Sequence, residues 1–87
     1  MKHFIILNDW SFDYESGTTV LGVTHSTEKA KQLFDKFASR EKQYAKDRGY
    51  FVYNNNEHDF DAGESGSYAQ NHTRVYIEEV EVEEWKS

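Results

Sequence analysis

Cysteine and proline are both absent from this 87-residue chain, and only five glycines are present. Without cysteine the chain can form neither a disulfide framework nor a thiolate metal site. The lack of proline and the scarcity of glycine argue against a long disordered linker. Two hydrophobic cores could not each bury enough surface at this length, so residues 1–87 are expected to form a single domain.

Long hydrophobic runs are missing as well. Phe4 to Leu7 is a run of only four apolar residues, which is far too short for a signal peptide or a membrane span. We therefore expect a cytoplasmic protein that makes no membrane contact. Aromatic residues compensate for the low aliphatic content, because six Phe, six Tyr and two Trp make up 16% of the chain. Each such ring can bury about 150–250 Å² in a core.

One amphipathic helix is predicted at residues 27–48. Its apolar residues recur at helical spacing along one side, with Glu41 as the single polar interruption. Ser26 is expected to cap the N-terminus, since its hydroxyl can accept a hydrogen bond from an N–H of the first turn. Gly49 is expected to end the helix because glycine takes a positive φ without strain. The apolar stripe consists of Ala30, Leu33, Phe34, Phe37, Ala38, Tyr44 and Ala45.

Strands are predicted on both sides of this helix, at residues 2–8, 18–25, 50–53 and 73–84. Residues 54–71 contain three consecutive asparagines with several Asp and Gly residues, a composition that favours turns. This segment is therefore predicted to be one long loop. The order β-β-α-β-β predicts an α+β two-layer sandwich, in which one helix covers one face of an antiparallel sheet of three to four strands.

The segment between the first two predicted strands is either a long hairpin loop or the ends of both strands. Trp10, Phe12 and Tyr14 alternate there, so in an extended chain all three would point the same way.

The last predicted strand changes its apolar face partway along. Val75 and Ile77 share one face, whereas Val80 and Val82 share the other. A β-bulge at residues 78–79 would return one side to the core. Without it, the strand is buried on opposite faces at its two ends.

Charge is distributed unevenly along the chain, whose net charge is −6. The helical segment has seven basic and four acidic residues, a net +3, whereas the remainder has three basic and twelve acidic residues, a net −9. The plainer interpretation of this acidity is solubility. A more specific one is a surface that repels nucleic acid and attracts a basic protein, so we expect no direct nucleic-acid binding. The candidate partner-binding residues are Glu57, Asp59, Asp61, Glu64, Glu78, Glu79, Glu81 and Glu83.

Catalytic and metal-binding motifs are not recognisable. The chain has no nucleophile elbow, phosphate loop or HExxH motif, so an enzyme is not expected. Hard and borderline metal ligands do cluster within fifteen residues, at His58, Asp59, Asp61, Glu64 and His72. Their spacing differs from an EF-hand loop, because Asp59 as first ligand would put Gly63 at the fifth position and no Glu at the twelfth. No specific metal or cofactor is predicted.

Three short segments carry a resemblance to known proteins: residues 20–23 (Val-Leu-Gly-Val), 26–30 (Ser-Thr-Glu-Lys-Ala) and 76–81 (Tyr-Ile-Glu-Glu-Val-Glu). In this pattern a hairpin feeds a helix that opens with Glu-Lys-Ala, and the chain ends in an acidic strand. It resembles the pattern of small uncharacterised ββαβ proteins of phages, prophages and Gram-positive bacteria. The resemblance implies the fold and an origin in a mobile element, and it implies no catalytic residue.

Three functions are consistent with these observations. The first is a non-enzymatic acidic protein-interaction module that binds a partner with a basic surface. In its most specific form this would be a phage-encoded inhibitor or nucleic-acid mimic that acts on a host nucleic-acid-handling or defence protein. The second is a small-ligand or divalent-metal-binding domain that uses the 54–72 segment. The third is a structural homodimer formed through the sheet face that the helix leaves open.

Overall fold

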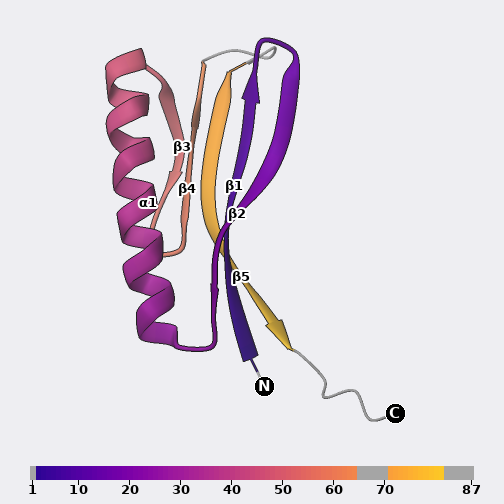
Figure 1. Cartoon of the computed structure of the whole chain (residues 1–87). Helices are drawn as coiled ribbons and strands as arrows, with labels where there is room; N and C mark the ends of the chain where they lie inside the picture. Colours follow the sequence, from indigo (N-terminus) through magenta and orange to yellow (C-terminus); the bar gives the residue numbers. More distant parts are fainter. Residues whose placement is uncertain (1, 65–70, 82–87) are drawn as a thin grey trace.

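The computed structural model describes residues 2–64 and 71–81 (Figure 1). In these residues the elements follow the order β1 (Lys2–Phe12), β2 (Glu15–Thr24), α1 (Thr27–Arg48), β3 (Phe51–Asn55), β4 (Asp59–Gly63) and β5 (His72–Glu81). The strands form one antiparallel sheet in the order β2-β1-β5-β4-β3. The helix packs on one face of this sheet (Figure 1). The expected α+β fold is confirmed, but the sheet has five strands rather than three to four.

The ends of α1 follow from local signals in the sequence. The Ser26 hydroxyl accepts a hydrogen bond from the backbone N–H of Lys29 at 3.2 Å. At the other end, Gly49 has φ +68° and its N–H is shared between the carbonyls of Ala45 and Lys46. The left-handed conformation at Gly49 turns the chain out of the helix and directs it into β3.

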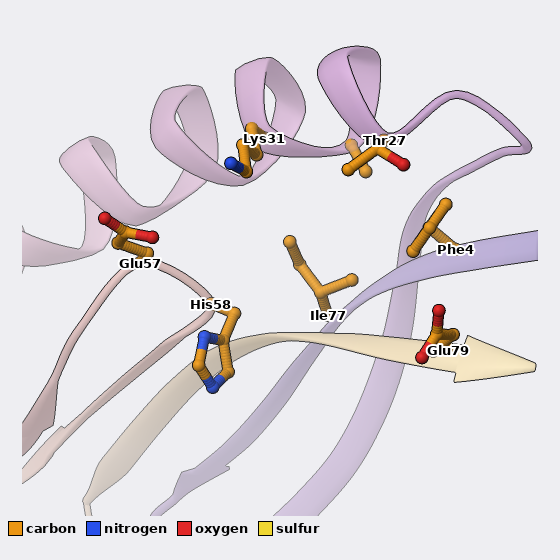
Figure 2. Close-up of a pocket in the computed structure, with 8 residues that line it drawn as sticks. Phe4, Thr27, Lys31, Glu57, His58, Ile77 and Glu79 are labelled. Atoms are coloured by element: carbon orange, nitrogen blue, oxygen red, sulfur yellow. The ribbon is translucent and has the colours of Figure 1, made fainter.

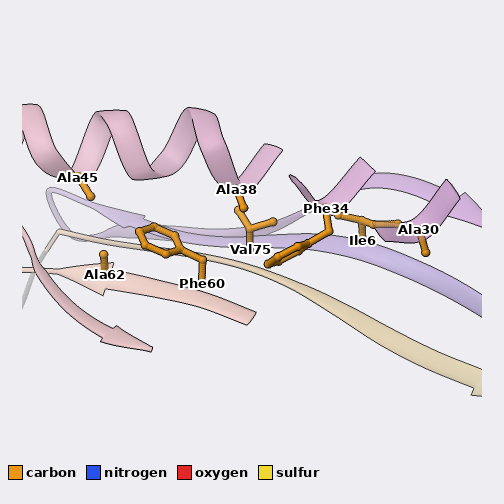
Figure 3. Close-up of a cluster of buried hydrophobic side chains, with 8 residues drawn as sticks. All are labelled: Ile6, Ala30, Phe34, Ala38, Ala45, Phe60, Ala62 and Val75. Carbon is orange, nitrogen blue, oxygen red and sulfur yellow. The ribbon is translucent and has the colours of Figure 1, made fainter. Parts of the chain in front are cut away.

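The core lies between α1 and the sheet (Figure 3). Phe34 of α1 and Phe60 of β4 are its largest side chains, and each is 1% exposed. Alanines occupy the other buried positions of α1, and their small side chains let the helix approach the strands closely. The buried cluster consists of Ile6, Ala30, Phe34, Ala38, Ala45, Phe60, Ala62 and Val75.

The prediction of one long loop at residues 54–71 is wrong, because β4 lies within it. Phe60 and Ala62 are buried on the α1 side of the sheet, while Asp59 and Asp61 alternate with them on the other side. This period-two pattern is only two apolar residues long and is surrounded by turn-forming residues. Pairing with both β3 and β5 therefore overrides a weak local strand propensity.

Of the two interpretations of the segment between the first two strands, the structure shows the ends of both strands, which form a tight β1–β2 hairpin. The strands reach Phe12 and Glu15, so only Asp13 and Tyr14 form the turn, with φ of 45° and 73°. Positive φ at both turn residues matches the right-handed twist of the flanking strands. Phe12 packs edge-on against the Tyr44 ring of α1, and Trp10 stacks on Phe12. Tyr14 lies in the turn instead and is 88% exposed.

Strand β5 pairs with β1 without a register shift, so the β-bulge predicted at residues 78–79 is not present in this pairing. Val75 and Ile77 pack toward α1, and alternation places Val80 on the opposite side. Val82 lies outside the described residues. Bulges occur instead at Leu21 in β2 and Tyr53 in β3, both of which are edge strands. Bulges at sheet edges hinder pairing with other chains.

Candidate functional site

The acidic candidate residues that lie in described strands are divided between the two sides of the sheet. Alternation along β5 places Glu79 and Glu81 on the α1 side and Glu78 on the open face. Glu57 lies in the turn between β3 and β4. Glu83 lies outside the described residues.

The two β4 aspartates lie on the open face and are bound by basic side chains of β5. Arg74 donates from Nε and Nη2 to the two carboxylate oxygens of Asp59, at 3.0 and 2.8 Å. These hydrogen bonds to Asp59 raise the pKa of the Arg74 guanidinium above its ordinary value. His72 pairs with Asp61 through Nε2. Both carboxylates are therefore already occupied within the domain.

Further hydrogen bonds extend this polar network along the open face. Asp9 accepts from the hydroxyls of Thr18, at 2.6 Å, and Tyr76, at 3.4 Å. Burial, and then the charge of Asp9, raises the pKa of the Tyr76 hydroxyl. Glu64 accepts from the Nδ2 of Asn71. Of the predicted acidic residues, the β4 pair and Glu64 thus serve to hold the sheet together.

A cavity of about 300 Å³ lies on the α1 side of the sheet, between the first turns of the helix and strands β1 and β5 (Figure 2). We call it the N-terminal groove. Its apolar lining comes from Phe4, Ala30 and Ile77. Its polar lining is formed by Thr27, Lys31, Glu57, His58 and Glu79. Two of the acidic candidates, Glu57 and Glu79, therefore line the same groove.

The β3–β4 turn brings Glu57 to this groove. The Asn56 side chain accepts from the N–H of His58, and the Asn56 N–H donates to the carbonyl of Asp59, both at 3.0 Å. The His58 carbonyl in turn accepts from the N–H of Ile77 at 3.0 Å. These bonds fix the tight turn and hold it against β5. The last asparagine of the asparagine run thus positions the site, as such side chains commonly do in turns.

The groove has charged groups at both ends of an apolar centre. In Figure 2, Ile77 lies at the centre, Glu57 and Lys31 lie at one end, and Glu79 lies near Phe4 at the other. Glu79 also forms an exposed ion pair with Lys2 at 3.2 Å, and such surface pairs are weak and readily exchanged. The arrangement suits a side chain or small molecule that combines an apolar body with a cationic group.

Sequence reasoning identified the carboxylates of this groove but not its apolar part. Phe4 and Ile77 belong to predicted strands and Lys31 to the predicted helix, and none of the three is among the candidate binding residues. They come from three segments that are distant along the chain. No local signal marks their meeting, which depends on the pairing of β1 with β5.

The residues considered as metal ligands do not form a metal site in the structure. Among residues 2–64 and 71–81, no group of three or more His, Asp or Glu side chains is placed to hold a metal ion. No helix of the described chain has the length and apolarity to cross a membrane.

Comparisons with known proteins find no match to this chain. No protein-family model, no curated protein and no solved structure matches the chain.

Proposed function

We propose that this protein is a non-enzymatic interaction domain that binds a basic segment of a partner protein in the N-terminal groove. The observation that supports it is a cavity with an apolar centre that has Glu57 at one end and Glu79 at the other (Figure 2). A lysine or arginine side chain of the partner would lay its hydrocarbon stem along Phe4 and Ile77. Its charged head would then form a charge-assisted hydrogen bond with either carboxylate.

The charge distribution of the whole chain favours the same partner. Outside α1 the chain has a net charge of −9, and Glu81 continues the acidic row of β5 beyond Glu79 on the α1 side. Such a field accelerates the approach of a basic protein and weakens with added salt. We propose that the partner is a nucleic-acid-handling or defence protein, as expected from the sequence. In the most specific form of this proposal, the protein is phage-encoded and inhibits that partner.

A second candidate function uses the same groove for a small organic cation. Its volume of about 300 Å³ lies at the lower end of the range typical of small-molecule pockets. Binding of such a cation without binding of basic peptides would favour this candidate.

Isothermal titration calorimetry with lysine- and arginine-rich peptides and with basic nucleic-acid-binding proteins tests the proposal. The variant E57Q/E79Q is expected to weaken binding about tenfold or more, since it removes both carboxylates of the groove. The control E15Q/E78Q removes the same charge from exposed residues that do not line the groove. Equal weakening by both variants would mean that net charge alone attracts the ligand. The proposal would then be wrong, as it would be if none of these ligands bound.

A further inference from the structure

Strand β3 is an edge strand that is exposed on both of its faces. All five of its residues are exposed, including Phe51 (56%), Val52 (45%) and Tyr53 (48%). In the described chain β3 pairs only with β4. Its outer edge therefore offers backbone N–H and C=O groups to which another extended chain can pair.

A second cavity, of about 500 Å³, lies on the α1 side of β3. We call it the C-terminal groove, because the α1 residues that line it belong to the C-terminal half of the helix. Lys42 and Lys46 of α1 line it together with Tyr50, Val52, Asn55 and Phe60. It shares no lining residue with the N-terminal groove.

The charge of this groove is opposite to that of the protein as a whole. Lys42 and Lys46 are four residues apart, so both project from the same side of α1. The Lys42 ammonium lies over the Phe60 ring, 5.7 Å from its centroid, which places a cation directly above the apolar floor. An acidic group is thus the complementary ligand here.

The opposite face of β3 presents two aromatic rings near the start of the strand. Register with β4 places Phe51 opposite Gly63, on the open face. The rings of Phe51 and Tyr53 lie beside each other, with centroids 5.0 Å apart. The Tyr53 hydroxyl donates to the Glu64 carbonyl at 2.7 Å, which anchors this pair of rings.

We propose that β3 binds an extended peptide with alternating acidic and apolar residues, which adds to the sheet as a sixth strand. Side chains of an added strand alternate between the two faces. Its acidic side chains would face Lys42 and Lys46, and its apolar side chains would pack beside Phe51 and Tyr53. The bulge at Tyr53 disturbs the edge and hinders unselective pairing, so recognition depends on these side-chain contacts.

This inference does not depend on the proposed function. It concerns a ligand of opposite charge at the other end of α1. A binding result for one groove therefore does not decide whether the other groove binds its ligand.

A synthetic peptide of alternating Glu and Val residues, with blocked ends, tests the inference by nuclear magnetic resonance titration and amide hydrogen exchange. We expect saturable binding that slows exchange of β3 amides, because added-strand pairing protects edge N–H groups. The variant K42E/K46E should bind this peptide about tenfold or more weakly than the wild type does. An alternating Lys–Val peptide should instead bind K42E/K46E more tightly than it binds the wild type. The control K29E/K36E makes the same charge change on α1 residues that do not line the groove.

Four results would overturn the inference. They are no binding at millimolar peptide, binding without protection of β3 amides, equal weakening by K29E/K36E, and self-association of the free protein through β3 in sedimentation experiments. Helical circular dichroism of each variant shows that it remains folded.

Discussion

Glu41 interrupts the apolar stripe of α1, and its contacts yield a quantitative prediction about how the helix is joined to the sheet. Its Oε2 accepts a hydrogen bond from the Thr73 hydroxyl at 3.1 Å, and Thr73 of β5 is only 1% exposed. The Nδ2 of Asn8 in β1 donates to the same hydroxyl at 3.1 Å, and to the Arg74 carbonyl at 3.0 Å. A polar chain of three side chains thus links α1, β5 and β1.

The substitution Thr73→Val keeps the shape of the side chain and removes the central hydroxyl of this network. A hydrogen bond to a charged group contributes about 1.5–3 kcal/mol and a neutral one about 0.5–1.5 kcal/mol. We therefore expect T73V to lower the free energy of unfolding by about 2–4 kcal/mol. That is a large part of the total for a chain of this size, which is about 4–13 kcal/mol at typical stabilities per residue.

A double-mutant cycle separates this interaction from other effects of the substitution. Glu41→Met alone leaves the Thr73 hydroxyl without its acceptor, whereas E41M/T73V replaces both partners with apolar groups. The loss in the double variant should therefore be smaller than the sum of the two single losses, by about 1–2 kcal/mol. Urea unfolding followed by circular dichroism measures all four proteins, with the exposed Ser39→Ala as a control expected to change stability by less than about 0.5 kcal/mol. Additive losses would refute the network as a source of stability.

Two further predictions concern the hairpin turn and the end of the helix. Tyr14→Gly should raise the free energy of unfolding by about 1 kcal/mol, because Tyr14 has φ 73° and is 88% exposed, and glycine adopts this conformation without the cost paid by other residues. A lower free energy of urea unfolding for Tyr14→Gly would contradict this reasoning. The control is Thr18→Gly in β2, which should be destabilising because Thr18 has no positive φ. Burial, followed by a hydrogen bond with Tyr44, raises the pKa of the Tyr50 hydroxyl from 10.0 to about 12. The folded state therefore favours the neutral phenol. This contribution to the free energy of unfolding is complete below pH 10 and should be lost as the pH rises toward 12. The unfolding free energy of Tyr50→Phe should therefore fall less between pH 10 and pH 12 than that of the control Tyr53→Phe. If the two variants lose the same unfolding free energy over this range, Tyr50 is not the source of the decline.

Local signals explain which parts of the fold the sequence predicts well. The helical period, a capping serine and a terminal glycine all lie within α1 or beside it, so the predicted range and the observed one coincide at Thr27–Arg48. Strand β4 was missed because Phe60 and Ala62 are its only buried apolar residues. Its position is decided by pairing with β5, whose partner residues follow those of β4 after an intervening segment of the chain.

The candidate site is less predictable for the same reason. Glu57 and Glu79 belonged to the predicted acidic set, but the sequence did not separate them from Asp59 and Asp61. Which carboxylates bind within the domain depends on the side of the sheet they face and on the basic side chains of the neighbouring strand, as Arg74 shows for Asp59. A charge is available to a partner only when the fold leaves it without a strong internal bond, and this property appears only once strand register is known.

The carboxylates of the N-terminal groove and Lys46 of the C-terminal groove also lie where their charges complement the dipole of α1, and this second role can be separated from binding. Carboxylates of the N-terminal groove lie near the positive end of the helix, and Lys46 lies in its last turn, near the negative end. Such charges stabilise a helix by about 0.3–1 kcal/mol each. If that were their whole role, E57Q/E79Q and K42E/K46E would lower the unfolding free energy by these amounts and leave peptide affinity unchanged. A binding role requires the affinity to fall even under conditions where every variant is fully folded, so stability and affinity measured on the same proteins distinguish the two roles.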